Sequence, residues 1–334
     1  MDNRPQILIT GWMPKEGRDI LEKYCDLDFC NSEKPLSKTE LIQRAKNKDG
    51  VVIFMTDTID KEVIQACNNL KVISSFGKGF DNIDVEECAK RGIAVTINKN
   101  SLTEDTADMA MGLALANARN ILIGDSEVRK GTTRGWQPKK NLGRRFNHSN
   151  LGIIGYGEIG KAIAKRAKGF SMTTYYYDPT VESVSWGAHK CEKLEEMFSK
   201  CDFIMITANL NKNSYHLVNR DNISYMKQGA FVVNVARGSI VDEKAIEEAL
   251  DANKISGYAS DVFAFEDKLA KECPQYISSG LLEKTEKTVF TPHLGTGTVE
   301  TRKELSISTA KGMLSVLKGE ETEQLITSGE ANMN

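Results

Sequence analysis

The chain contains no long apolar run, and none of its 334 residues fall in a stretch approaching the roughly 20 apolar residues of a membrane-spanning helix. Its start, Met1–Pro5, has neither the basic segment nor the apolar stretch of a secretory signal peptide. Charge is balanced, with 44 Lys and Arg against 46 Asp and Glu, so no broad charged surface is expected. Together, these absences predict that the protein binds neither a membrane nor a nucleic acid.

Cysteine and histidine are also sparse. The seven cysteines are scattered without any Cys-x-x-Cys, which predicts no metal site and no disulfide framework, and favours a reducing, cytoplasmic location. Because there are only four histidines, a catalytic histidine has few candidates.

The remaining sequence alternates short β-rich apolar runs with helical segments, which predicts an α/β fold of parallel sheets flanked by helices. At roughly 100–200 residues per domain, the length suggests two domains. A long helix is expected from about Glu104 to Arg129, ended by Gly131, and another at Val299–Lys318. The predicted strands are Gln6–Thr10, Val51–Met55, Lys71–Ser74, Ile93–Ile97, Leu151–Gly155, Thr173–Tyr177, Phe203–Thr207, Ala230–Val235, Ile255–Ser260 and Lys287–Phe290.

A glycine motif follows the fifth predicted strand. Gly155, Gly157 and Gly160 form G-x-G-x-x-G between a strand and a helix, the pattern of a dinucleotide-binding turn. Asp178 lies 18 residues after Gly160, at the end of the next strand, near the expected distance of about 20. Its carboxylate would bind the adenosine ribose and repel a 2′-phosphate, which predicts NAD rather than NADP; a turn-forming Asp is the structural alternative.

Three polar clusters follow later strands and include Arg237, Glu266 and His293. Ligands of open parallel sheets bind beyond the carboxyl ends of the strands, so these side chains are expected to converge. Arginine suits an anionic substrate, histidine can transfer a proton near neutral pH, and a neighbouring glutamate would fix its tautomer. Taken singly, each residue could instead be an ordinary surface or salt-bridge group.

At these motifs the chain resembles the D-isomer-specific 2-hydroxyacid dehydrogenase family. The resemblance covers about residues 5–320 and rests on Gly77–Asp84, Gly155–Gly160, Asn234–Asp242, Ser260–Phe263 and Thr291–Gly295. It implies two Rossmann-like domains with the active site in the cleft between them: a substrate domain of residues 1–99 and 297–334, and an NAD domain of 100–296 whose arm, 101–150, builds a homodimer.

The resemblance also implies roles for individual residues. Arg237 would bind the substrate anion, and His293 with Glu266 would form the acid–base dyad. The implied cofactor-binding residues are Thr106, Gly155, Gly157, Glu158, Ile159, Gly160, Asp178, Pro179, Ala208, Leu210, Val235, Ala236, Arg237, Asp261, His293 and Gly295.

Other features resemble the phosphonate (phosphite) dehydrogenase branch of this family, including Lys78–Asn82, Gly135–Pro138 and the long spacing between Glu266 and His293. That branch implies Lys78 as a further catalytic residue and oxidation of phosphite to phosphate with NAD. The implied substrate-binding residues are Met55, Lys78, Gly79, Arg237, Trp136, Thr296 and Arg302. Three cations, Lys78, Arg237 and Arg302, would match a dianion better than a singly charged 2-hydroxy acid.

The chain departs from that branch at Asn141, where its pattern has a tyrosine, and at Ala236 and Thr296, where it has cysteine and serine. One alternative is a D-2-hydroxyacid dehydrogenase or a glyoxylate or hydroxypyruvate reductase with the same Arg237, Glu266 and His293. A non-enzymatic alternative is an NAD-sensing, corepressor-like binding protein, against which the complete Arg–Glu–His set argues.

Overall fold

The computed structural model describes residues 4–32, 34–99, 101–182 and 185–326. The chain divides into two units, one of Met1–Leu102 with Thr296–Asn334 and one of Thr103–Gly295. Each unit is built on its own parallel sheet, as expected from the strand–helix alternation.

The first unit has a five-stranded sheet in the order β2-β1-β3-β4-β5. Its strands are β1 (Gln6–Ile9), β2 (Asp26–Phe29), β3 (Gly50–Ile53), β4 (Val72–Ser75) and β5 (Ala94–Thr96). Its helices are α1 (Lys15–Glu22), α2 (Lys38–Ala45), α3 (Lys61–Ala66), α4 (Val85–Lys90) and α12 (Val299–Lys318).

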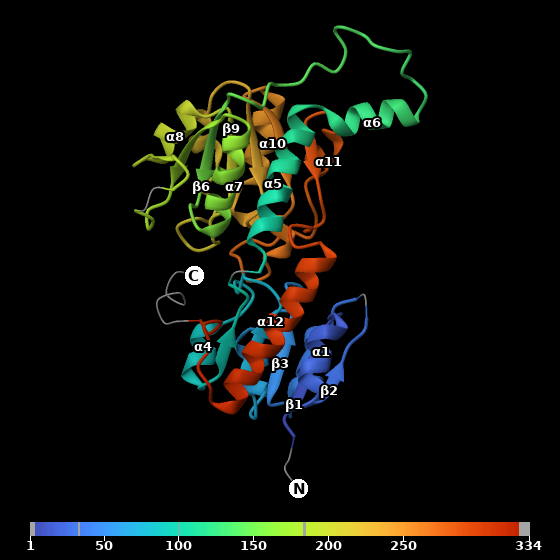
Figure 1. The fold of residues 1–334 in the computed structure, drawn as a ribbon, viewed down its shortest axis with the longest axis vertical. Helices are drawn as coiled ribbons and strands as arrows, with labels where there is room; N and C mark the ends of the chain where they lie inside the picture. Colours follow the sequence, from blue (N-terminus) through green and yellow to red (C-terminus); the bar gives the residue numbers. More distant parts are fainter. Residues whose placement is uncertain (1–3, 33, 100, 183–184, 327–334) are drawn as a thin grey trace. The chain divides into compact units, whose positions relative to one another are not determined.

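The last helix of the first unit, α12, packs lengthwise against α1 although the two are almost 300 residues apart (Figure 1). Gly17 makes this approach possible, because a Cβ there would lie 2.3 Å from the backbone oxygen of Ser306. On the other side of the sheet, α2, α3 and α4 cover a core that contains Leu41, Ile64 and Ile73. The helix predicted at Val299–Lys318 is confirmed with those bounds.

The second unit has a seven-stranded parallel sheet in the order β12-β11-β10-β9-β6-β7-β8. Its strands are β6 (Asn150–Ile154), β7 (Thr173–Tyr177), β8 (His189–Lys190), β9 (Phe203–Ile206), β10 (Ala230–Asn234), β11 (Ile255–Ser260) and β12 (Thr288–Phe290). Its helices are α5 (Thr103–Ala118), α6 (Ile121–Arg129), α7 (Glu158–Gly169), α8 (Leu194–Lys200), α9 (Arg220–Ser224), α10 (Glu243–Asp251) and α11 (Ser279–Glu283), with short 3₁₀ turns η1 (Gly238–Ile240) and η2 (Ala264–Glu266).

The strand order of the second unit reverses between β6 and β9. From β6 the chain builds outward to β7 and β8, and it then returns to place β9 on the opposite side of β6. Helices α5 and α7 cover one face and α8, α9 and α10 the other, over two separate apolar cores. A reversal of this kind opens a crevice at the carboxyl ends of the two strands, where dinucleotides bind in such folds.

The single helix predicted from about Glu104 to Arg129 is wrong. It is two helices, because Asn120 between them adopts a left-handed backbone with φ of 54°. Helix α6 has no buried residue, and Figure 1 shows it, with the chain that follows, projecting from the layered body of the second unit. The predicted end holds, since Gly131, with φ of 67°, lies two residues past the last helical residue.

Candidate active site

The turn after β6 requires glycine. Gly155 has φ of 87°, and a Cβ on it would lie 2.6 Å from the Cα of Ala208, the residue that follows the end of β9 by two positions. Gly160 lets α7 approach the same turn, because a Cβ there would lie 2.4 Å from the backbone oxygen of Gly155. Thr207 Oγ1 donates to that oxygen at 2.6 Å. The motif therefore forms a tight turn at the point where the strand order reverses.

The start of α7 suits a dinucleotide phosphate. Gly157 is its N-cap, no side chain of the described residues caps it, and a Cβ at Gly157 would meet nothing within 4 Å. The N–H groups of the first turn are therefore open to a ligand, and the helix dipole favours an anion there. Glu158 is exposed beside them and pairs with Lys161 at 3.0 Å. These residues fit the pyrophosphate of a nicotinamide dinucleotide.

Asp178 lies at the end of β7 beside this turn. Its Oδ2 accepts the N–H of Tyr156 at 2.8 Å, and its Oδ1 accepts the N–H groups of Thr180 at 2.8 Å and Val181 at 3.2 Å. The carboxylate thus fixes its own turn and also ties β7 to the glycine motif. These contacts agree with the turn-forming role of Asp178. They also leave room for the predicted ribose contact, because Oδ2 has one protein donor and retains a lone pair for a ribose hydroxyl.

His293 and Glu266 form a pair in the second unit. His293 Nδ1 lies 2.6 Å from Glu266 Oε2, and both side chains are partly exposed, at 30% and 23%. The other Glu266 oxygen, Oε1, accepts the N–H of Phe263 at 2.8 Å. The carboxylate is therefore held by its own backbone and orients the imidazole, which leaves Nε2 as the atom that can exchange a proton with a substrate.

Asp261, predicted to contact the cofactor, holds the turn of His293. It is 1% exposed, and its carboxylate accepts the N–H groups of Leu294 and Gly295, both at 2.7 Å. Its backbone oxygen accepts the N–H of His293 at 2.8 Å, and His293 itself has φ of 56°. Asp261 thus stabilises a backbone conformation that a histidine adopts only at a cost.

Two further predicted cofactor residues meet at this turn. Thr106, buried on α5, donates from Oγ1 to the backbone oxygen of Gly295 at 3.4 Å. The other members of that set lie at strand ends or beside the glycine turn, but their contact with a cofactor stays a prediction: Ile159, Pro179, Ala208, Leu210, Val235 and Ala236.

Arg237 follows β10, and its loop is organised by Asn234, which is not among the predicted site residues. The fully buried Asn234 donates from Nδ2 to the Arg237 backbone oxygen at 2.8 Å, and its Oδ1 accepts the N–H of Ala236 at 3.0 Å. Arg237 Nη1 donates to the Ala236 oxygen at 2.7 Å. Two signals pointed to Asn234: its place at the end of an apolar strand, where an uncharged amide can be buried if both its ends are bonded, and its position at the start of the Asn234–Asp242 motif.

The remaining predicted substrate residues divide between the units. Met55, Lys78, Gly79, Thr296 and Arg302 belong to the first unit. Gly79 follows β4, and its backbone oxygen accepts from Ser75 Oγ at 3.2 Å. Trp136, in the second unit, is 89% exposed on the loop after α6.

Arg302 lies in the first turn of α12 and is partly buried. Burial lowers the pKa of its guanidinium. Among the described residues no carboxylate pairs with it. A desolvated arginine without an acidic partner is a candidate for binding an anionic ligand.

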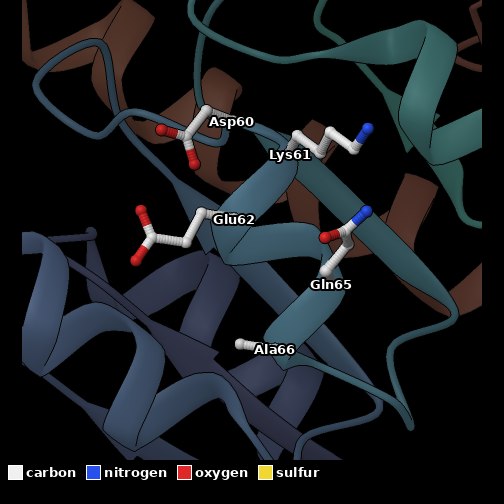
Figure 2. Close-up of a pocket in the computed structure, with 5 residues that line it drawn as sticks. All are labelled: Asp60, Lys61, Glu62, Gln65 and Ala66. Atoms are coloured by element: carbon white, nitrogen blue, oxygen red, sulfur yellow. The ribbon is translucent and has the colours of Figure 1, made fainter.

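A surface hollow of about 650 Å³ lies elsewhere in the first unit, along α3 (Figure 2). Figure 2 shows the carboxyl groups of Asp60 and Glu62 on one side of the helix start, with Lys61 and Gln65 on the other. Lys38 neutralises both acids, with its Nζ 2.7 Å from Asp60 Oδ2 and paired with Glu62. The hollow contains none of the predicted site residues.

No group of three metal-ligating side chains occurs among the described residues. Over the same residues, no helix has both the length and the apolar character needed to cross a bilayer.

The glycine turn, the reversed strand order and the histidine–glutamate pair together define a nicotinamide-dinucleotide-dependent oxidoreductase. Comparison with known proteins makes the class specific. Residues 111–295 match the model of the D-isomer specific 2-hydroxyacid dehydrogenase, NAD binding domain. The chain is 35% identical to glyoxylate reductase of Pyrococcus furiosus and 36% identical to that of Pyrococcus horikoshii, over 95% of this chain and 94% of each relative.

Solved structures of a reductase and a dehydrogenase are also similar to this chain. The NADPH-dependent glyoxylate/hydroxypyruvate reductase of Sinorhizobium meliloti, in complex with NADP and malonate, is 25% identical, with a TM-score of 0.85 over 97% of both chains. D-Lactate dehydrogenase of Aquifex aeolicus, complexed with NAD and lactic acid, is 25% identical, with a TM-score of 0.81 over 94% of this chain and 96% of that one. The chain belongs to the D-isomer-specific 2-hydroxyacid dehydrogenase family, and its cofactor is a nicotinamide dinucleotide.

Proposed function

We propose that this chain reduces glyoxylate and related short 2-keto acids, such as hydroxypyruvate, to the corresponding 2-hydroxy acids. The observation that carries the chemistry is the contact between His293 and Glu266 in a dinucleotide-binding unit. The glyoxylate reductases among the relatives support the choice of substrate. This reverses the order of preference drawn from the sequence, where phosphite oxidation came first.

In this proposal Arg237 binds the substrate carboxylate, because a guanidinium donates two parallel hydrogen bonds to such a group. A nicotinamide dinucleotide held at the glycine turn would supply the hydride for the keto carbon. His293 donates a proton from Nε2 to the forming alkoxide, and Glu266 holds the imidazole through Nδ1 and stabilises the orientation that this transfer needs. In the reverse direction His293 accepts the proton of the hydroxyl group.

We propose NAD(H) rather than NADP(H) as the preferred cofactor. Asp178 carries a negative charge at the end of β7, where the ribose of a dinucleotide binds in this fold. No Arg or Lys follows it in Pro179–Glu182 to neutralise a 2′-phosphate. The contacts of Asp178 with Tyr156 and Thr180 fix that charge beside the glycine turn.

Phosphite oxidation remains the second candidate, and the desolvated Arg302 favours it. With Lys78 and Arg237 this residue would give the substrate three cations, which suits a dianion. Lys78, Arg237 and Arg302 would then hold the oxyanion, and His293 would orient or deprotonate the attacking water. Under this proposal Met55, Gly79, Trp136 and Thr296 complete the substrate contacts.

One assay separates these candidates. The purified protein is incubated with NADH and glyoxylate, hydroxypyruvate or pyruvate, and separately with NAD and phosphite, while the absorbance of the reduced nicotinamide is followed. Oxidation of NADH only with the keto acids is the expected result, and the His293→Asn variant should abolish it. Turnover with phosphite alone would replace the first candidate by the second, and no turnover in either assay would favour an NAD-sensing binding protein.

We further propose that the protein is a cytoplasmic homodimer. The structure leaves all seven cysteines as free thiols, six of them buried, which suits a reducing compartment. Helix α6 and the loop after it expose apolar side chains, among them Val128 at 66% and Leu142 at 74%. Exposed apolar groups on a projecting segment are typical of a surface that a second copy covers.

A further inference from the structure

Two short turns in the second unit adjoin Arg237 and Glu266, two of the groups assigned to catalysis. Turn η1 follows Arg237 directly, and turn η2 ends at Glu266. The turns touch through their backbones: a Cβ on Gly238 would lie 1.9 Å from the carbonyl carbon of Phe263 and 2.0 Å from the nitrogen of Ala264. No side chain therefore separates the segment of Arg237 from that of Glu266.

A carboxylate reaches from η2 to η1. Asp267, the residue after η2, is 3% exposed, and its Oδ2 accepts the N–H of Ser239 in η1 at 2.7 Å. A hydrogen bond from a backbone N–H to a buried carboxylate is stronger than one between neutral groups, so it fixes the position of both partners.

A second carboxylate reaches the other way. Glu243 lies three residues past η1, at the start of α10, and its Oε1 accepts the N–H of Ala264 in η2 at 3.1 Å. Helix α10 does not need this carboxyl as a cap, because Asp242 already accepts the N–H groups of Lys244 and Ala245. The side chain of Glu243 is therefore committed to the neighbouring turn.

The surroundings of Glu243 make this placement costly. Burial raises the pKa of its carboxyl, and the nearby carboxylates of Asp267, Asp242 and Glu266 raise it further. Among the described residues no Lys or Arg forms an ion pair with Glu243. An acid buried among other acids contributes little to stability by itself, which favours a role in positioning.

We propose that Glu243 and Asp267 act as a reciprocal pair of carboxylate clamps, which hold the Arg237 turn and the Glu266–His293 pair in one fixed arrangement. Each acid follows one turn and binds a backbone N–H of the other. Both are positioning residues, because they touch the backbone that carries the catalytic groups. The inference rests on the proposed function only in assigning those roles to Arg237 and His293.

Displacing reacting groups by about 1 Å can cost about 100-fold in rate, so the clamps should act on kcat. The variants Glu243→Ala and Asp267→Ala remove the acceptors, whereas Glu243→Gln and Asp267→Asn keep an oxygen that can accept the same N–H. Glu248→Gln is the matched control, because Glu248 lies on α10 and pairs with Arg220 at the surface.

Each Ala variant is expected to lower kcat for glyoxylate about tenfold or more, while the Kd for NADH, measured by fluorescence, stays within about twofold. The Gln and Asn variants should recover most of kcat. Wild-type kcat in both Ala variants, or an equal loss in the amide and Ala variants, would overturn the proposal.

A second measurement needs no substrate. The proton between His293 and Glu266 should give a downfield NMR signal, which is assigned by its loss in His293→Asn. It should shift or broaden in the Ala variants and persist in Glu243→Gln, even if glyoxylate proves not to be the substrate. An unchanged signal in folded Ala variants contradicts the clamp.

If Glu243→Ala does not fold, Glu243→Met fills the same space without an acceptor and replaces it in both measurements. If neither variant folds while Glu243→Gln does, the side chain serves the fold and the proposal is wrong.

Discussion

His293 Nδ1 lies 2.6 Å from Glu266 Oε2, although 27 residues separate the two in the chain. This pair predicts which substitutions stop the reaction. His293→Asn removes the proton donor and should lower kcat about 10²- to 10⁴-fold, the usual contribution of general acid–base catalysis. Glu266→Gln should lower kcat to a smaller extent, because it weakens the orientation of the imidazole and leaves the imidazole itself in place.

Steady-state kinetics together with fluorescence titration of NADH check this prediction. The NADH Kd should stay near that of the wild type in both variants, because neither residue belongs to the glycine turn. His189→Asn, at an exposed position on β8, is the control and should be fully active. A His293→Asn variant with near-normal kcat would refute the assignment of the proton donor.

The glycine motif predicts two different outcomes for the same substitution. Gly155→Ala would force a Cβ to within 2.6 Å of Ala208 at a backbone φ of 87°, so it should destabilise the protein by at least about 1–3 kcal/mol. Gly157→Ala meets no atom within 4 Å and should leave the thermal midpoint almost unchanged. It should nevertheless weaken NADH binding about tenfold, equivalent to about 1.4 kcal/mol, because the methyl group stands where the phosphate approaches.

Thermal melting and NADH titration of the two glycine variants test this difference. If Gly157→Ala bound NADH as tightly as the wild type, the pyrophosphate would not approach the start of α7, and that part of the site assignment would fall.

Asp178 predicts the choice between the two cofactors. Asp178→Asn removes a negative charge from the end of β7 and should raise kcat/KM for NADPH relative to NADH about tenfold or more. Thr180→Val is the control, since it deletes only the hydroxyl that bonds Asp178 Oδ1 at 2.8 Å and keeps the charge. A wild-type preference for NADPH in a direct comparison of kcat/KM would contradict the role given to this carboxylate.

Much of the fold could be predicted from apolar patterning. All ten predicted strands occur, and most of them are runs buried on both faces of a parallel sheet, although β7 has buried residues on one face only. Strands β2 and β8 were missed, and both lie at a sheet edge, where they pair with one neighbour only. In Asp26–Phe29 no residue is fully buried, so the strand lacks the continuous apolar signal of the others.

The dyad and the glycine turn were also predictable, because their residues follow strand ends in recognisable motifs. The supporting groups were not. Glu243 and Asp267 act through hydrogen bonds to backbone atoms 21 and 28 residues away, and such contacts leave no local pattern. The break at Asn120 could not be predicted either, because apolar residues continue on both sides of it and give no sign that a helix ends there.

Two aspartates of the first unit predict opposite dependences of stability on pH. Burial raises the pKa of Asp57 above its ordinary value of 3.8, although its bonds with Phe54 N–H and Thr10 oppose the shift. Folding therefore favours its protonated form, and the wild type loses this contribution as pH rises through the raised pKa. As the pH rises through this range, Asp57→Asn should therefore gain stability relative to the wild type.

Asp28 is the matched control with the opposite sign. Its hydrogen bond with Arg44 lowers its pKa below 3.8, so the stability it contributes is present above that value and is lost as pH falls. The thermal midpoint of Asp28→Asn should lie below that of the wild type at neutral pH and approach it in acid. Midpoints measured across pH for both variants check the two signs, and parallel curves for Asp57→Asn and the wild type would contradict the first.

The exposed apolar side chains of α6 and its loop predict the oligomeric state. Because α6 buries no residue within its own chain, Val128→Glu and Leu142→Glu should leave the thermal stability of the isolated fold nearly unchanged. In a dimer that buries these side chains, two glutamates placed in an apolar contact would lose their water without a partner, so the double variant should dissociate to monomers. Sedimentation velocity at micromolar concentration distinguishes the monomer from the dimer.

Tyr276→Glu is the control for this prediction. Tyr276 is 79% exposed and lies outside the arm, so this variant should remain dimeric. A monomeric wild type, or a double variant that stays dimeric, would exclude this surface as the interface.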